Sequence, residues 1–380
     1  MRLTTRQLNR ATLQRQLLLK RADGGVVGAV RAVAALQAQS PAGPYIGLWN
    51  RVSSFDASDL DLAYATHQVV KASLMRMTVH TVTAADYAAF HVAMVEDLRR
   101  GRLADPRFTV GGVSIKKADA LMPDVIAFAS ETRSKAELEA MIAERAGTGS
   151  GKPVWWAYQY LTPIVHAPTG GPWSFGDRRS YLAARMGSFE GHRAPALAVL
   201  IRRYLEAFGP ASASDVGMFT MLPQPPIKAG LALLADELVT HEGPDGKPLL
   251  DIGDGPLPPE DTLAPPRLLP MWDNVLTAYR DRSRIVPEAY RRVIGKNNGD
   301  TLPSLLVDGY VADVWRPAPE AAGGIEVTAF HRLDTATWQY VEREARSLVR
   351  FLQDRDPRVY GRYNHWWKTM PSAQVRVLGG

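Results

Sequence analysis

The stretch APALAVLIRRYLEAFGPASASDVGMFTMLPQPPIKAGLALLADELVTHEGPDGKPLLDI (194–252) decides the fold. Its first fifteen residues, 194–208, have the apolar spacing of a helix, and Gly209-Pro210 is a sequence that ends helices. A second helix, 212–221, begins with a serine that can cap its first turn. The run 225–235 predicts a third helix.

Two strand-like runs, 238–241 and 249–252, follow these helices. The loop between them, EGPDGK (242–247), consists largely of turn-forming residues, so the two runs predict a β-hairpin. Three helices followed by a hairpin is the plan of a winged helix, a DNA-binding variant of the helix-turn-helix unit.

The same order of elements occurs twice more along the chain. Residues 3–82 predict helices at 5–19, 26–37, 44–52 and 58–66, followed by β-rich runs at 69–74 and 77–82. Residues 115–176 predict helices at 115–130, 134–146 and 154–161 and a hairpin around 168–172. No sequence identity links the three stretches, so the repetition is one of architecture.

The C-terminal part has a different pattern. A proline-rich stretch, 253–266, predicts a linker. Strands at 304–307, 310–315 and 325–330 and a helix at 335–352 follow it. The fold class is therefore α+β, with three tandem winged-helix units and a C-terminal α+β domain. The expected divisions are 1–110 (including a connecting helix), 111–190, 191–262 and 263–380.

Composition limits the class of protein. With 380 residues, 46% apolar and 22% charged, the chain suits a soluble globular protein of two or three domains. No apolar run is long enough to span a bilayer, and the polar N-terminus does not resemble a signal peptide, so we expect a cytoplasmic protein without a membrane partner. The absence of cysteine excludes disulfides, a thiol nucleophile and thiolate zinc ligands.

Positive charge is concentrated at both ends. The net charge is +6, and residues 341–380 hold eight basic side chains against four acidic ones. Residues 1–55 hold one acid, Asp23, and eight basic residues: Arg2, Arg6, Arg10, Arg15, Lys20, Arg21, Arg31 and Arg51. This distribution favours a basic groove lined by both ends of the chain, although a solvated surface would give the same pattern.

The usual catalytic and cofactor motifs are missing. GTGSGK (147–152) resembles a phosphate-binding loop, but Pro153 stands where that motif needs serine or threonine. No zinc-protease, nucleophile-elbow or dinucleotide motif occurs. The eight histidines are scattered, and His80 suits a satisfied strand histidine better than a metal ligand. We therefore expect neither a metal nor a cofactor.

One polar residue conflicts with its helical pattern. Val26, Val30 and Val33 form an apolar stripe, and continuing the helical count places Gln37 within it. A buried amide is costly when unpaired, so Gln37 should have partners or border a cavity. Ser40 precedes a proline, which indicates that the helix ends nearby. If the chain straightens after Gln37, Gln39 lies on the same side and two amides could hold one water. Alternatively, Gln37 caps the helix and Gln39 is solvated.

A second cluster contains LLPMWDN (268–274), AYRDR (278–282) and RRVIGKNNGD (291–300). Its Asn298-Gly299 pair is a strong signal for a tight turn. Basic residues on both sides of that turn would make a hairpin able to enter a DNA groove. An ordinary surface hairpin would have the same sequence features.

These motifs, with LTTRQLNRATLQRQLLL (3–19), LQAQSP (36–41), RMTVH (76–80) and LLVDGYVADVW (305–315), give the chain a family resemblance. It resembles the bacterial winged-helix DNA glycosylase superfamily, which excises alkylated purines, from residue 3 to about residue 350. Its Gln-Ala-Gln at 37–39 is similar to the Gln-x-Gln type, typified by an azinomycin-resistance glycosylase that unhooks interstrand crosslinks. The sister type has aspartate at the position of Gln39.

The resemblance implies three winged helices forming a concave, positively charged cleft for double-stranded DNA that carries alkylated purines or crosslinks. Gln37 and Gln39 would be catalytic, and a hairpin in the cleft would be essential. We map that hairpin to 290–307, with the wing at 164–176 as its rival. The expected DNA-binding residues are Arg280, Arg282, Arg291, Arg292, Lys296, Asn297 and Asn298.

Two other classes of DNA-binding protein share this pattern. A winged-helix transcription regulator usually has one or two such units and a dimerisation module. No heptad repeat or long dimer helix occurs in this sequence, so we expect a monomer and favour the enzyme. A non-catalytic architectural protein would bind DNA and release no base.

Overall fold

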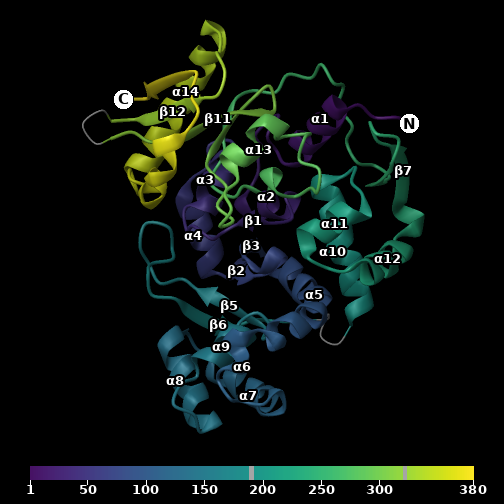
Figure 1. The fold of residues 1–380 in the computed structure, drawn as a ribbon, viewed down its shortest axis with the longest axis vertical. Coiled ribbons are helices and arrows are strands. Elements are labelled where there is room, and N and C mark those ends of the chain that lie inside the picture. The colour runs from purple at the N-terminus through teal and green to yellow at the C-terminus, as the bar shows by residue number, and fades with distance from the viewer. Residues whose placement is uncertain (188–191, 320–322) are drawn as a thin grey trace.

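A computed structural model describes residues 1–187, 192–319 and 323–380 (Figure 1). The mixed α+β class predicted from the sequence is confirmed. The expected boundary between residues 190 and 191 lies outside the described residues. Of the described helices, none is long and apolar enough to cross a membrane.

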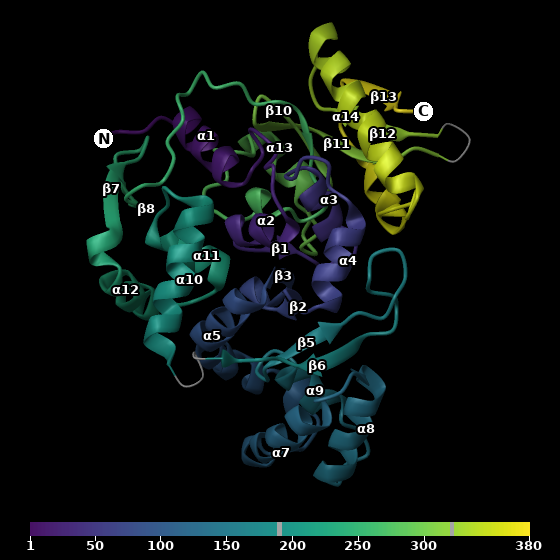
Figure 2. The same ribbon diagram turned by 180° about the vertical axis from the view of Figure 1, so that it is seen from behind.

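The stretch 194–252 folds as predicted. Its helices are α10 (Arg193–Phe208), α11 (Ala213–Thr220) and α12 (Gln224–Leu233), and its hairpin is β7 (Leu238–Glu242) with β8 (Pro248–Ile252). Ser212 caps α11 in a capping box with Asp215, the local signal that made this helix predictable. The N-terminus lies beside β7, where the Leu3 N–H donates to the Glu242 carbonyl at 2.8 Å (Figure 2).

The N-terminal stretch differs from its prediction at one decisive place. Its elements are α1 (Thr5–Arg15), α2 (Val26–Ala32), β1 (Leu36–Gln37), α3 (Gly43–Trp49), α4 (Ala57–Ala65), β2 (Val69–Ser73) and β3 (Val79–Thr83). The predicted helix 26–37 is too long, because Ala34 has a left-handed backbone (φ +62°) that ends the helical path. Gln37 therefore lies in a strand and not on a helical stripe.

The hairpins of the first two stretches belong to one sheet. After the long α5 (Ala84–Ala104) come α6 (Pro106–Thr109), α7 (Ile115–Phe128), β4 (Arg133–Ser134), α8 (Lys135–Ala146), α9 (Lys152–Tyr158), β5 (Ile164–Ala167) and β6 (Ser180–Ala183). The strand order is β1-β3-β2-β5-β6-β4, joined between the stretches where Lys71 opposes His166. Because this sheet is shared, the division into three separate winged helices stays a prediction.

The C-terminal domain is built on a five-stranded antiparallel sheet in the order β13-β12-β11-β10-β9. Its elements are β9 (Arg267–Leu268), α13 (Glu288–Ile294), β10 (Ser304–Val307), β11 (Tyr310–Pro317), β12 (Ile325–Ala329), α14 (Thr335–Gln353) and β13 (Gln374–Leu378). The predicted apolar face of α14, which includes Trp338 and Leu348, is buried. This domain and α7–α9 lie at opposite ends of the molecule (Figure 1).

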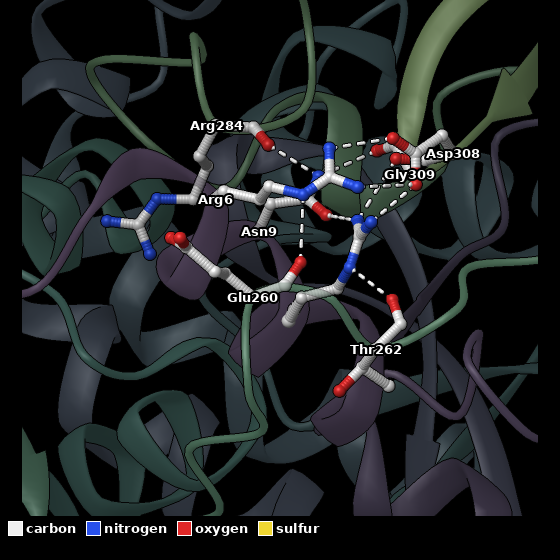
Figure 3. Close-up of polar contacts among 8 residues, drawn as sticks. Arg6, Asn9, Glu260, Thr262, Arg284, Asp308 and Gly309 are labelled. Atoms are coloured by element: carbon white, nitrogen blue, oxygen red, sulfur yellow. Dashed lines mark hydrogen bonds and ion pairs between the residues drawn. The ribbon is translucent and has the colours of Figure 1, made fainter.

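Helix α1 is held against the C-terminal domain by polar contacts (Figure 3). The Asn9 side-chain amide donates to the carbonyls of Arg284 and Gly309, at 2.7 and 2.8 Å. Arg6 donates to the Asp308 carboxylate and to the Glu260 carbonyl. Gly309 has φ +83°, and a Cβ there would lie 2.5 Å from the Asn9 side chain, so only glycine fits this turn.

The basic residues near the N-terminus are paired with acidic side chains. Each of the eight basic residues predicted to line a groove lies within ion-pair distance of a carboxylate, and most of these carboxylates are far away in the sequence. Arg15, for example, forms a buried pair with Asp251 at 2.8 Å. The local surplus of charge therefore reflects pairing across the fold, which the sequence alone does not reveal.

The most consequential of these pairs joins Arg51, just after α3, to Asp273, 222 residues further on. Two hydrogen bonds of 2.9 Å connect the guanidinium to both carboxylate oxygens, and both side chains are almost fully buried. A neighbouring hydrogen bond joins the same two parts of the chain: the Asn50 side-chain amide donates to the Leu268 carbonyl at 2.8 Å. The segment 268–274 is thereby fixed against the N-terminal part of the chain.

We expect Asp273→Ala to lower the free energy of unfolding by about 3–5 kcal/mol, because it leaves a buried guanidinium without its counterion. The double variant Arg51→Met/Asp273→Leu removes both charges and should lose much less. Denaturant titration of the three proteins measures the difference. Equal losses in the single and double variants would contradict this account of the pair.

A candidate active site around Gln37 and Gln39

The Gln-Ala-Gln segment runs along an edge of the six-stranded sheet. Strand β1 pairs antiparallel with β3, so that Gln37 faces His80, and the Ala38 N–H donates to the Val79 carbonyl at 2.8 Å. The first turn of α3 approaches from the other side. A Cβ at Gly43 would lie 2.7 Å from the Gln37 carbonyl oxygen, so glycine is required there.

The two glutamine side chains line one cavity of about 390 Å³. Gln37 is 6% exposed, whereas Gln39 is open to solvent. The Gln39 backbone N–H donates to Gln37 Oε1 at 2.9 Å, which fixes the orientation of the Gln37 amide. Both predicted catalytic residues therefore border the same space, as expected for an extended chain with a two-residue spacing.

His80, the strand partner of Gln37, belongs to a buried polar network. His80 Nδ1 lies 3.1 Å from the Thr78 carbonyl, and His80 Nε2 lies 3.4 Å from the Arg76 guanidinium. Burial, together with the Arg76 charge, lowers the pKa of His80 to about 3. The ring is therefore neutral, with Nδ1 as the donor and Nε2 as the acceptor. His80 is a satisfied strand histidine, as the sequence suggested.

Arg76 was not singled out from the sequence, although it also lines the cavity. It donates to Asn274 Oδ1 at 2.8 Å, and none of the described carboxylates pairs with it. Burial lowers the pKa of Arg76 to about 10, so it remains a cation at neutral pH. Arg76 and Met77 both have left-handed backbones, with φ of 54° and 51°.

The predicted DNA-binding residues do not all lie at the same cavity. Arg282, Lys296 and Asn298 line the cavity of the two glutamines. Arg280 and Arg291 line another cavity, of about 440 Å³. Arg292 and Asn297 line neither.

The hairpin predicted at 290–307 is wrong in part. Arg291 and Arg292 lie on helix α13, which begins after Pro287. The Asn298-Gly299 turn does form, because the Lys296 N–H donates to the Asp300 carbonyl at 2.8 Å and Gly299 has φ +89°. The two arms of this turn form an isolated β-bridge between Gly295 and Thr301 and belong to no continuous strand pair there. The loop 295–301 thus borders the site without being a long β-hairpin.

A larger cavity, of about 660 Å³, adjoins the first one and shares Gln39 and Thr78 with it. The rival wing, 164–176, also reaches the site, because Thr169 and Phe175 line this cavity. Arg178 and Arg179, which follow the wing in the connection between β5 and β6, line it too. The segment 358–363 contributes further basic and aromatic side chains. Only the surplus of charge near the C-terminus pointed to this segment.

Lys71 is a buried amine in the wall of the larger cavity. Its exposed fraction is 7%, and its Nζ lies 4.2 Å from the centre of the Phe175 ring. Burial, together with the nearby Arg179 charge, lowers the pKa of Lys71 to about 7.

The site combines two neutral amides with a cavity lined by cations, which suits a hydrolase that acts on DNA. Comparison with known proteins identifies the class as DNA glycosylase. The chain belongs to the AlkZ-like DNA glycosylase family, whose model matches residues 30–351. It is therefore an enzyme that hydrolyses N-glycosyl bonds, and its substrate is DNA. The resemblance noted in the sequence is confirmed.

The fold is also that of a solved structure. Streptomyces sahachiroi DNA glycosylase AlkZ matches with a TM-score of 0.77 at 19% sequence identity, over 94% of this chain and 98% of that chain. No curated protein gives a significant match. Within residues 1–187, 192–319 and 323–380, no group of three His, Asp or Glu side chains is arranged to hold a metal ion.

The Lys71 environment predicts a pH dependence of stability. A pKa lowered from 10.5 to about 7 means that the unfolded chain binds more protons than the folded one between these values. Stability should therefore rise with pH across this window. Lys71→Met should flatten that rise, measured by denaturant titration at pH 7, 8.5 and 10. Lys228→Met, at an exposed lysine on α12, is the control and should leave the rise unchanged.

Proposed function

We propose that this glycosylase hydrolyses the bond between deoxyribose and cationic N7-alkylpurines, including those that form interstrand crosslinks. The observation that carries the proposal is that two neutral amides, Gln37 and Gln39, line a single cavity. Among the described residues of that cavity, Asp300 alone is acidic, and its carboxylate accepts hydrogen bonds from Asn298 and Trp366. The proposed catalytic groups are therefore the amides.

The chemistry of the leaving group explains why amides can suffice. Most glycosidases use one carboxylic acid to protonate the leaving group and one carboxylate to act on water or on the sugar. A purine alkylated at N7 already carries a positive charge, so breaking its bond to C1′ releases a neutral base. A general acid is then unnecessary, and water needs only to be held against an oxocarbenium-like carbon.

The geometry of the two amides suits this task. Because Gln37 Oε1 accepts the Gln39 N–H, its orientation is fixed before substrate binds. In the proposed reaction the amide oxygens accept hydrogen bonds from one water and aim it at C1′, which is catalysis by orientation. Water adds to C1′, the base leaves with the bond electrons, and the proton passes to solvent. The product is an abasic site, with no covalent enzyme intermediate.

The charge around the cavity suits a nucleic-acid backbone. Arg76, Arg282 and Lys296 all line it. In the proposed complex they bind phosphates on either side of the damaged nucleotide, and the Arg178 and Arg179 side of the larger cavity extends the contact. Two such hydrolyses, one on each strand, would release a crosslink. We infer that a monomer acts in this way in the cytoplasm, in DNA repair or in self-resistance to an alkylating natural product such as azinomycin.

The two rival classes lose support. A transcription regulator or an architectural protein would bind DNA and release no base, whereas the chain belongs to a glycosylase family.

Gln37→Ala and Gln39→Ala should each lower the rate of N7-methylguanine release from duplex DNA by about 10²-fold or more, because the water loses its orientation. Single-turnover assays with mass spectrometry of the released base measure the effect. Gln14→Ala, at an exposed glutamine on α1, is the matched control and should retain full activity. EDTA should change nothing. Full activity in both site variants would refute the assignment.

Binding to duplex DNA should depend strongly on salt and little on sequence. Arg282→Ala and Lys296→Ala should each reduce the slope of log affinity against log salt by about 1, because each removes one phosphate contact. Lys228→Ala should leave the slope unchanged. Fluorescence anisotropy with several unrelated duplexes measures both properties. Tight binding to a single sequence would instead support the regulator.

A further inference from the structure

Trp272 combines an unusual backbone with a position in the proposed site. Its φ is +57°, in the left-handed region that bulky side chains rarely adopt. Neither glycine nor asparagine, the residues that tolerate this conformation, stands at the position. Strain of this kind persists only where the surroundings enforce it, and it is concentrated at functional sites.

Trp272 is held by two hydrogen bonds to the loop 295–301. Its backbone N–H donates to the Thr301 carbonyl at 3.1 Å, and its indole Nε1 donates to the Gly299 carbonyl at 2.9 Å. The next residue, Asp273, forms the buried pair with Arg51. These contacts fix both the backbone and one edge of the ring.

A further hydrogen bond connects the segment of Trp272 to that of the two glutamines. Asn274 donates to the Ala35 carbonyl at 2.9 Å, two residues before Gln37. This hydrogen bond connects the segment that carries Trp272 to the chain just before Gln37.

The indole lines the cavity of Gln37 and Gln39 and is only partly buried. Tyr363 meets it edge to face, with ring centres 5.5 Å apart and an angle of 81° between the rings. Tyr363 lines the larger cavity, so the aromatic pair stands where the two cavities adjoin. A partly exposed aromatic ring at this position is available to a ligand that enters the cavity.

We propose that Trp272 is the stacking platform for the alkylated purine, with its ring face on the damaged base while the two glutamines address the sugar. This inference rests on the proposed function and adds an explanation of how the enzyme selects a positively charged purine. The face of an indole is electron-rich and attracts a cation more strongly than any other aromatic side chain. Arg76, Arg282 and Lys296 would repel a cationic base, so the ring supplies an attraction that these groups do not.

The attraction between the indole and the base weakens as the reaction proceeds. Hydrolysis converts the bound cationic purine to a neutral one, and the attraction to the indole weakens. The ring therefore holds the base more tightly before bond cleavage than after it, which favours release of the product.

Replacement by asparagine separates a binding role from a structural one. Asparagine tolerates the left-handed backbone, so Trp272→Asn removes the ring without adding strain. We expect its kcat/KM on N7-methylguanine duplex to fall about ten- to a hundredfold, with a thermal midpoint close to that of the wild type. Trp272→Phe keeps a ring face and should retain most of the activity. Tyr340→Ala, at a half-exposed aromatic on α14, is the control.

The decisive readout is charge selectivity in binding. At a pH low enough to keep N1 of 7-methylguanosine protonated, this nucleoside is cationic whereas guanosine is neutral. Under that condition the wild type should be inhibited more strongly by 7-methylguanosine than by guanosine, and Trp272→Asn should abolish or reverse this preference. Asp300→Asn should preserve it, because the ring and not this carboxylate selects the cation. The inference is overturned if the preference for 7-methylguanosine persists in Trp272→Asn, or if Asp300→Asn abolishes it. If the wild type releases no N7-methylguanine, the proposed function itself has failed.

Discussion

The buried pair of Arg51 and Asp273 is the constraint on which the site depends. It joins residues 222 positions apart, and both charges are shielded from water. A pair of this kind is tolerated only when its geometry is close to ideal, so it accepts few alternative arrangements of the two segments. The pair therefore holds the segment 268–274 against the part of the chain that carries Gln37 and Gln39. Residues from both segments line the cavity of the two glutamines.

Local signals allowed much of the fold to be predicted from the sequence. Helix α11 has a capping box at Ser212 and Asp215, and α14 has an apolar stripe at helical spacing, so both were placed almost to the residue. The end of α2 was misplaced because the turn at Ala34 uses an alanine in a conformation that sequence patterns assign to glycine. Pairing of Gln37 with His80 is a long-range event, and no short pattern encodes it.

The positions of the charged residues were harder to predict from local sequence than the helices were. Arg10 and Arg51 are fully buried, although a local count of charge suggested an exposed basic surface. Arg291 and Arg292 flank a predicted turn but lie on a helix, whereas Arg76, which was not selected, lines the cavity of the two glutamines. Whether an arginine neutralises a carboxylate or awaits a phosphate depends on partners hundreds of residues away. The sequence therefore predicted the candidate amides better than it predicted the cations around them.

In the proposed mechanism, the neutral, aromatic and cationic side chains of the site have different tasks. The amides orient water without being charged, and the cations hold a backbone whose phosphates neutralise them. Neither group attracts a charged purine in preference to an ordinary one, and an enzyme on duplex DNA meets a vast excess of ordinary bases. Discrimination then arises from two steps that both depend on the positive charge of the purine. The first is attraction of the cation to an indole face, and the second is departure of the base without an acid. Because the two steps act in sequence, modest selectivity in each multiplies, and undamaged DNA is spared without a tightly enclosing pocket.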